Sequence, residues 1–266
     1  MKDVKIGFIG GGNMAGALIA GIVNSGSIAP ENITVSDLDR SKLDALGKLG
    51  VNTTTSNEEA EEKSEILFLA VKPNIMPVCL DGLKSFEDKI YVSIAAGITL
   101  EFLESRLGAD RKIVRTMPNT PALVGCGMTV ITPNSNLSAD EAELVENILK
   151  SVGETVRLEE KYMNAAIALH SSSPAYIFML IDAMADAGVK YGLTKAQALK
   201  LAAKAVEGSA KMTLESAEHP MKLKDNVCSP GGTTIAAVCE LERNGFRADI
   251  QSAIDACVDK AESMSK

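Results

Sequence analysis

The sequence contains few residues that could hold a metal or form cross-links. Its two histidines are His170 and His219, so a metal site would need mostly carboxylates, and no clustered pattern supplies them. The five cysteines are scattered and never form a Cys-x-x-Cys pair. This pattern argues against a disulfide framework and a zinc site, and it favours reduced thiols. We therefore expect no metal.

Long apolar runs and surplus positive charge are also missing. No uninterrupted apolar stretch approaches the about 20 residues of a membrane span. The opening MKDVKIGFIGGGNM lacks the longer apolar region and the small-residue cleavage site of a signal peptide. The net charge of −8 disfavours non-specific attraction to nucleic acid or to an anionic membrane. We expect a cytoplasmic protein with neither of these partners.

What the chain does have is enough length for one large domain or two ordinary ones, at 266 residues. Its first half alternates short apolar segments with amphipathic ones. The apolar segments are rich in Ile and Val, which is typical of buried strands; they cover 4–10, 33–37, 65–71, 89–97, 112–117, 128–134 and 154–160. Helix candidates lie between them at 13–25, 41–49, 99–107 and 138–150. This alternation indicates βαβ units and a mostly parallel sheet covered on both faces.

From about Lys161 onward the strand signals vanish. Ile177, Leu180, Ile181 and Met184 have the spacing of one helix face. Strong helix formers fill 194–216, and the tail is similar. Only SSSP (171–174) and CSPGG (228–232) interrupt this half. We predict an all-α second domain over 161–266, after an α/β domain over 1–160.

A glycine-rich loop follows the first predicted strand and opens a helix. Gly10, Gly12 and Ala15 fit the pattern G-x-G-x-x-G/A. In this arrangement the first glycine makes a tight turn, the second lets the backbone approach a pyrophosphate, and the small third residue lets helix and strand pack closely. Because the motif sits at the first β–α turn, it predicts a Rossmann-type dinucleotide-binding domain.

The second predicted strand ends in SDLDR and gives conflicting signals about the dinucleotide. Asp37 would accept hydrogen bonds from the ribose hydroxyls of NAD, whereas the nearby Arg40 would suit the phosphate of NADP. Asp37 could equally be a plain charge at a helix N-terminus. The segments 70–73 and 95–97 end further strands and should border the cofactor. Lys72 is either a ligand contact or a solvated loop charge.

The stretch CSPGGTT (228–234) is an uncharged interruption in the helical half. Gly231 and Gly232 would let a ligand approach the backbone, while Thr233 and Thr234 would cap the next helix or donate hydroxyls. Bare N–H groups at such a helix start can hold a carboxylate. Taken alone, the segment is explained as well by a capped helix without a ligand.

Several longer segments follow one another along the chain in a familiar order; they are GFIGGGNMA, FLAVKP, SIAAG, RTMPNTPALV, SSPAY, GSAKM, EHP, LKDNVCSPGGTT and GFR. In this order and approximate spacing the chain resembles the pyrroline-5-carboxylate reductase family. The resemblance implies an NAD(P)H-dependent reductase that makes L-proline from 1-pyrroline-5-carboxylate, the last step of proline biosynthesis. It also implies a helical domain that forms a homodimer by interlocking helices, with dimers assembling further to a decamer. The active site would lie between a cofactor domain and helices that include the partner subunit.

The resemblance also implies the site residues. Substrate would bind Ser229, Gly231, Gly232, Thr233 and Thr234, with Thr234 hydrogen-bonding the imine nitrogen as a catalytic residue that either donates a proton or orients the ring. The expected cofactor-binding set is Gly10, Gly11, Gly12, Asn13, Met14, Ala15, Ser36, Asp37, Asn57, Ala70, Val71, Lys72, Pro73, Ala95, Ala96, Gly97 and Asn226. The cofactor would be NADPH or NADH.

Four other residues carry weaker expectations. Asn119, between two prolines, lies near the nicotinamide or only terminates a strand. His219, before Pro220, is most simply a helix-ending residue, with a functional role as the alternative. His170 and Ser171 replace a small residue and a glycine of the family pattern SGSSPAY. We expect activity to survive this change, but it puts the preference among cyclic imino acids in doubt.

Two further functions are compatible with parts of the sequence. A β-hydroxyacid dehydrogenase-like enzyme also joins a Rossmann half to a helical half, and its lysine would be Lys161 or Lys190. Neither lysine sits in a matching glycine-rich context. A cofactor sensor on a reductase scaffold is the non-enzymatic alternative, although a sensor need not keep both the glycine loop and SPGGTT.

Overall fold

The computed structural model describes residues 3–264. These residues divide into two compact units. The first holds residues up to Ser171 together with those from Cys257 onward, and the second holds Ser172–Ala256. The sequence-based domain boundary at 160 stays a prediction.

The first unit is built on one eight-stranded sheet with the order β3-β2-β1-β4-β5-β6-β7-β8. The strands are β1 (Ile6–Ile9), β2 (Ile33–Ser36), β3 (Asn52–Thr54), β4 (Ile66–Leu69), β5 (Ile90–Ser93), β6 (Lys112–Met117), β7 (Gly127–Pro133) and β8 (Gly153–Arg157). Neighbouring strands are parallel except for the pair β6–β7. The strand order reverses between β1 and β4, and ligands of such sheets bind at the carboxyl ends of the strands beside this point.

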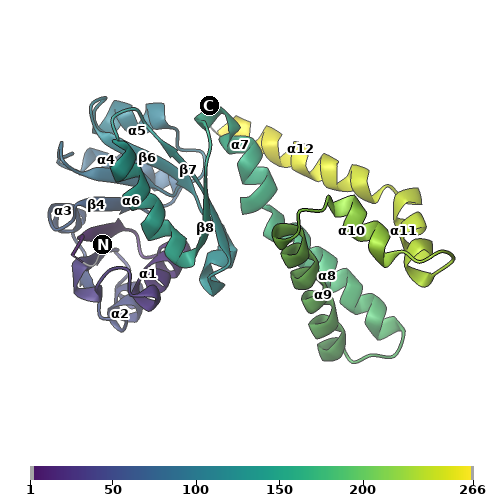
Figure 1. Cartoon of the computed structure of the whole chain (residues 1–266). Helices are drawn as coiled ribbons and strands as arrows, with labels where there is room; N and C mark the ends of the chain where they lie inside the picture. The colour runs from purple at the N-terminus through teal and green to yellow at the C-terminus, as the bar shows by residue number, and fades with distance from the viewer. Residues whose placement is uncertain (1–2, 265–266) are drawn as a thin grey trace. The chain divides into compact units, whose positions relative to one another are not determined.

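Helices cover both faces of this sheet, as Figure 1 shows. The helices are α1 (Asn13–Ser25), α2 (Arg40–Gly47), α3 (Asn57–Glu62), α4 (Met76–Asp81), α5 (Leu100–Leu107) and α6 (Ala139–Leu149). Successive residues of a strand point to opposite faces, so β4 divides its side chains between two cores. Phe68 packs with α1, α2 and α6 and stacks on Phe8 at 4.6 Å, whereas Leu67 and Leu69 pack with α4 and α5. Burial on both faces explains why these strands read as continuous apolar runs.

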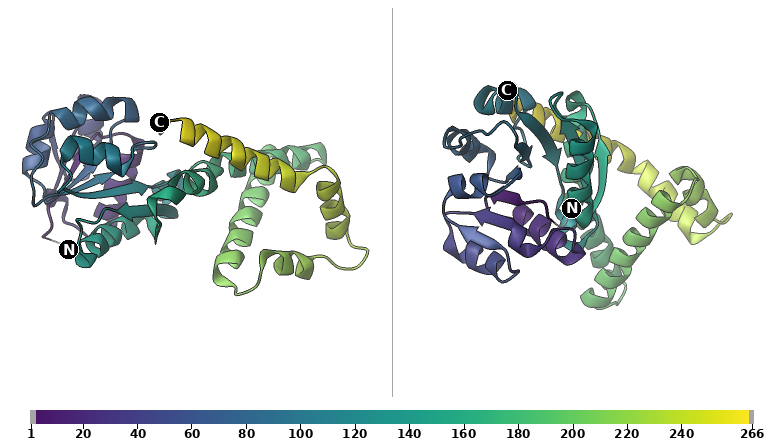
Figure 2. Two further views of the ribbon diagram at one scale, coloured as in Figure 1. Left: turned by 90° about the horizontal axis from the view of Figure 1, so that it is seen from above. Right: turned by 60° about the vertical axis from the view of Figure 1, so that its left-hand side comes forward.

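The first unit ends in α7 (Met163–Ala166) and a π-helical turn over Ile167–Ser171. The second unit contains α8 (Ser173–Lys190), α9 (Lys195–Glu215), α10 (Pro220–Val227) and α11 (Thr233–Arg243), and α12 (Phe246–Met264) begins in it. Helices α8 and α9 run side by side, as both views in Figure 2 show. Small residues permit this close packing, because Ala185, Ala198 and Ala202 are buried, and a Cβ on Gly188 would lie 2.9 Å from that of Ala198.

The predicted fold class is confirmed: a mostly parallel sheet with helices precedes an all-α part. Three elements were missed, namely β3, α3 and α4. The expected interruption at 171–174 is short, because only Ser172 separates the π-helical turn from α8. The interpretation of His219 is wrong: its Nδ1 accepts the Met221 N–H at 3.2 Å, so it caps the start of α10. None of the helices within residues 3–264 has the length and apolar character needed to cross a membrane.

Candidate active site

The glycine loop joins β1 to α1 and has the geometry that the motif predicts. Gly10 has φ +100°, and a Cβ there would lie 2.7 Å from the carbonyl oxygen of Ala70, so a larger residue does not fit. The Gly10 N–H donates to Ser36 O at 2.7 Å and joins the loop to the end of β2. Gly12 precedes α1 without a side-chain cap, and a Cβ on it would have no heavy atom within 4 Å. The start of α1 therefore has open space in front of its N–H groups, as a bound phosphate requires.

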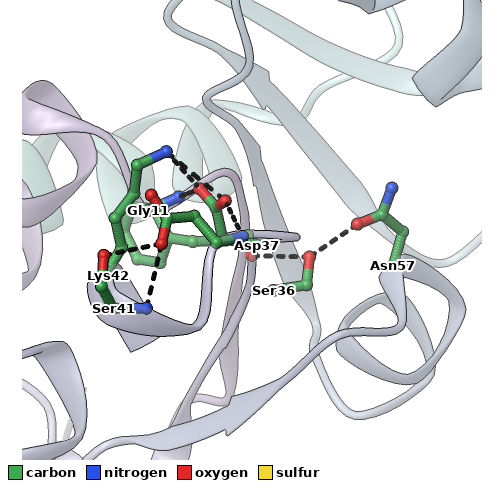
Figure 3. Close-up of polar contacts among 8 residues, drawn as sticks. Gly11, Ser36, Asp37, Ser41, Lys42 and Asn57 are labelled. Carbon is green, nitrogen blue, oxygen red and sulfur yellow. Dashed lines mark hydrogen bonds and ion pairs between the residues drawn. The ribbon is translucent and has the colours of Figure 1, made fainter. Parts of the chain in front are cut away.

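The end of β2 supplies a carboxylate that contacts this loop (Figure 3). Asp37 Oδ2 accepts the Gly11 N–H at 2.7 Å, and its Oδ1 accepts the Asp39 N–H at 2.8 Å. Lys42 Nζ lies 3.2 Å from Oδ2. Burial by itself raises the pKa of the Asp37 carboxyl, but the hydrogen bonds from Asp39 and Gly11 and the charge of Lys42 outweigh it, so the pKa lies below its usual value. Asp37 is thus ionised at neutral pH.

A cavity of about 390 Å³ opens beside these groups. Predicted cofactor residues from four separate segments line it: Gly10, Gly12, Ser36, Asp37, Asn57, Ala70, Val71 and Lys72. The Ser36 hydroxyl donates to Asn57 Oδ1 at 2.8 Å, as Figure 3 shows. The cavity also has lining residues that the sequence did not single out: Ile9, Leu38, Lys42, Ile75, Val78 and Cys79.

The remaining predicted cofactor residues of the first unit lie outside the lining of this cavity. Asn13 and Met14 begin α1, and the side chain of Ala15 is fully buried, which matches the packing role of the third motif position. Pro73 follows β4, and the segment 95–97 follows β5. Both lie at the carboxyl ends of strands, as expected, and their contact with a cofactor stays a prediction.

The second unit contains the uncharged loop before α11. Gly231 has φ +66° and open space around its Cα, so it permits the turn and a close approach. Gly232 is the N-cap of α11 and offers no side-chain cap. A Cβ there would require Ser229 Oγ to shift and would lie 3.1 Å from Ser229 O, so a side chain at this position is disfavoured. Thr233 and Thr234 form the first turn of the helix. The predicted interruption is confirmed as a loop between α10 and α11, while its substrate role stays a prediction.

Asn226 lies on α10, immediately before this loop, and is exposed. Its contact with the cofactor stays a prediction.

His170 lies in the π-helical turn and contacts the loop after β6. One ring nitrogen, Nε2, lies 2.9 Å from Met117 O, and the other contacts Ala166 O. Asn119 Nδ2 donates to His170 O at 3.0 Å, and Asn119 Oδ1 accepts the Met128 N–H at 2.9 Å. His170 and Asn119 therefore connect the π-helical turn to the carboxyl end of β6. These contacts with backbone groups indicate a structural role for His170, which is the common role of a single histidine within helices.

The residues of the first unit fit a dinucleotide. Gly10 and Gly12 leave room for it, the start of α1 suits its phosphates, and Asp37 can accept ribose hydroxyls. Within residues 3–264, no group of three or more His, Cys, Asp or Glu side chains could hold a metal ion. The fold and this cavity define the class of the protein as a nicotinamide-dependent Rossmann oxidoreductase.

Comparisons with known proteins identify the family within that class. Residues 160–264 match the family model for pyrroline-5-carboxylate reductase dimerisation, and residues 5–97 match that of the coenzyme F420-dependent NADP oxidoreductases. The chain is 49% identical to pyrroline-5-carboxylate reductase of Escherichia coli, with 99% of each chain covered. The chain belongs to the pyrroline-5-carboxylate reductase family.

Solved structures agree with this assignment. The NADP-bound pyrroline carboxylate reductase of Plasmodium falciparum has a TM-score of 0.91 at 34% identity, with 100% of both chains covered. The enzyme of Coxiella burnetii has a TM-score of 0.91 at 36% identity over 99% of each chain. The predicted enzyme class, an NAD(P)H-dependent reductase of 1-pyrroline-5-carboxylate, is confirmed, and a dehydrogenase lysine at Lys161 or Lys190 is not needed. The match to a dimerisation model supports homo-oligomerisation.

Proposed function

We propose that this chain reduces 1-pyrroline-5-carboxylate to L-proline by holding the substrate carboxylate at the start of α11. The observation that carries this proposal is the uncapped start of α11 behind Gly231 and Gly232. When bound, the nicotinamide supplies the hydride for the imine carbon. The chain itself supplies binding and orientation at near-attack distance.

The carboxylate is bound by backbone groups and not by a cation. The first N–H groups of an α-helix have no partner within the helix, and the helix dipole adds positive potential there. Gly231 is exposed and its φ of +66° turns the chain so that a ligand can reach these N–H groups. Since Gly232 provides no capping oxygen, a substrate carboxylate takes that place.

We propose that Thr234 is the residue of this segment whose side chain contacts the reacting imine. It lies in the first turn of α11 and is partly exposed. An aliphatic hydroxyl is a poor acid, so its proposed role is to hydrogen-bond the imine nitrogen and orient the ring, with the proton coming from solvent. Thr234→Val should lower kcat at least tenfold with a smaller change in KM, whereas Thr234→Ser should keep most activity. If Thr234→Val has the wild-type kcat, Thr234 has no such role.

The proposed assembly is a homodimer through the helical unit, with dimers forming a decamer. Large apolar side chains of the helical unit remain exposed in the single chain; they include Phe178, Met179, Leu201, Met212, Leu214 and Val227. An apolar surface of this extent is typical of a protein interface. Sedimentation of the purified protein tests this, and a monomer at micromolar concentration would contradict it.

We place the enzyme in the cytoplasm. Cys79, Cys126, Cys228 and Cys239 form no disulfide in the structure, as is usual for proteins of a reducing compartment. Fractionation of the source cells tests this location.

The reaction is tested by following NADH and NADPH oxidation with 1-pyrroline-5-carboxylate. Proline should form in equal amount to the nicotinamide oxidised. If neither cofactor is oxidised by folded, oligomeric protein, the proposed function is wrong.

A further inference from the structure

We propose that Asp37 makes this chain select NADH over NADPH. This inference rests on the proposed function, because it concerns the nicotinamide cofactor of the same site. The sequence left the choice open, since Asp37 favours one cofactor and Arg40 the other. The positions of the side chains decide between them.

The Asp37 carboxylate is held at the glycine loop. Oδ2 accepts the Gly11 N–H at 2.7 Å, while the Gly10 N–H bonds to the carbonyl of Ser36, directly before Asp37. Oδ1 accepts the Asp39 N–H at 2.8 Å. Only 13% of the side chain is exposed, and it lines the cavity. With these partners the carboxylate cannot turn away from a bound nucleotide without losing hydrogen bonds to the loop.

The chemistry of this group suits a ribose with two free hydroxyls. An ionised carboxylate is an acceptor only and has about four lone-pair positions, so it can accept hydroxyl donors while keeping its N–H partners. The 2′-phosphate of NADPH removes one donor hydroxyl and brings a charge of about −2 close to the carboxylate. NADPH would therefore lose a hydrogen bond and meet a like charge, while NADH would meet neither cost.

The cations of α2 do not reverse this balance, and Lys72, which also lines the cavity, follows the end of β4 and not the end of β2, where the ribose is expected. Lys42 is the cation that reaches the cavity from α2, and its Nζ is already paired with Asp37 at 3.2 Å. The pair has no net charge to offer a phosphate. Arg40 is the first residue of α2, is exposed, and does not line the cavity. Asn57 adds an amide whose oxygen accepts from Ser36. Its N–H groups carry no formal charge, and they serve a ribose hydroxyl as well as a phosphate.

The test measures binding separately from turnover. NADH and NADPH are titrated against the intact protein without substrate, and the dissociation constants are obtained from nicotinamide fluorescence and calorimetry. We expect the wild type to bind NADH at least about tenfold more tightly than NADPH, because two like charges repel each other in a partly screened site. Asp37→Asn keeps an acceptor for Gly11 and removes the charge, so the ratio should fall at least about tenfold.

Asp39→Ser is the matched control. It removes an equal charge two residues away, and serine still caps α2, where Asp39 accepts the Ser41 N–H at 3.0 Å. Its NADH-to-NADPH ratio should stay at the wild-type value. Asp37→Ser is a second variant in case the amide disturbs the loop, and its ratio should fall like that of Asp37→Asn.

The inference is overturned if the wild type binds NADPH as tightly as NADH. It is also overturned if both Asp37 variants keep the wild-type ratio, or if Asp39→Ser shifts the ratio as much as they do. A protein with the expected binding ratio that fails to oxidise NADH with 1-pyrroline-5-carboxylate would disprove the proposed function and leave the cofactor selection intact.

Discussion

Arg115 Nη1 donates to Glu160 Oε1 across 2.7 Å, and only 3% of the arginine side chain is exposed. The same oxygen accepts the N–H of Leu100, the first residue of α5, at 2.8 Å. Among the described residues, the Nε and Nη2 atoms of Arg115 are buried without a hydrogen-bond partner. Glu160 therefore neutralises the buried charge of Arg115 on β6 and also binds the start of α5.

Removing that carboxylate should destabilise the protein. Glu160→Ala leaves the Arg115 charge buried and unpaired, which should cost about 3 kcal/mol of the free energy of unfolding. Urea denaturation followed by circular dichroism measures the change. The control is Glu159→Ala, whose ion pair with Lys161 is exposed, so little change is expected. If the two variants have the same free energy of unfolding, the buried pair contributes no more to stability than the exposed one.

Substituting two glycines of the loop should have different effects, one on stability and the other on nucleotide binding. Gly10→Ala needs φ near +100° and places a Cβ 2.7 Å from Ala70 O, so it should lose about 2 kcal/mol or more of stability. Gly12→Ala has an ordinary φ of −72° and open space, so the melting temperature should hold while nucleotide binding weakens at least about tenfold. Thermal melts and cofactor titrations of both variants separate the effects. A Gly12→Ala protein that binds cofactor normally would contradict a pyrophosphate at this position.

The contacts of His170 should affect the preference for substrate. The double variant His170→Ser with Ser171→Gly removes the ring contacts with Met117 O and Ala166 O. We expect it to remain active, with a changed ratio of kcat/KM between five- and six-membered cyclic imino acids. Steady-state kinetics with both substrates measures this ratio, and Leu169→Ala, at an exposed neighbour, is the control. An unchanged ratio in the double variant would show that His170 and Ser171 do not influence the substrate preference.

The cysteines should differ in reactivity according to burial. Burial, and secondly the charge of Glu61, raises the pKa of the Cys79 thiol to about 11. A raised pKa favours the neutral thiol in the folded state, so its stabilising effect is complete below the unfolded value of 9.0 and is lost as the pH rises through about 11.

At pH 8, iodoacetamide should therefore label the exposed Cys126 and Cys239 at least about tenfold faster than Cys79. Mass spectrometry of the native protein measures the rates, with urea-unfolded protein as the reference. Equal rates in the native protein would contradict the buried position of Cys79.

The sequence predicted those elements whose apolar pattern is strong. Buried strands such as β4 and β5 are continuous apolar runs, so their positions were clear. In contrast, β3 consists of Asn52, Thr53 and Thr54 at the edge of the sheet and buries little, so its sequence has no apolar pattern. The helix α3 had a usable signal that was missed, because Ser56 accepts the Glu59 N–H as an N-cap.

The sequence predicted the site residues whose roles depend on backbone geometry. It did not predict contacts between side chains from different segments. The roles of Gly10 and Gly12 follow from the motif. The pairing of Lys42 with Asp37 depends on how α2 begins, and the contact of Ser36 with Asn57 joins the end of β2 to the start of α3. No local pattern encodes such contacts, and for this reason the sequence could not decide between Asp37 and Arg40.

The carboxylate-binding role of the α11 start is tested most directly by comparing two substrates. Purified wild-type protein is assayed with 1-pyrroline-5-carboxylate and with 1-pyrroline, which lacks the carboxylate but keeps the imine ring. The account predicts turnover of 1-pyrroline-5-carboxylate and a kcat/KM for 1-pyrroline at least about 100-fold lower, because charge-assisted hydrogen bonds to the carboxylate are lost. Equal kcat/KM values for the two imines, or no turnover of 1-pyrroline-5-carboxylate, would contradict it.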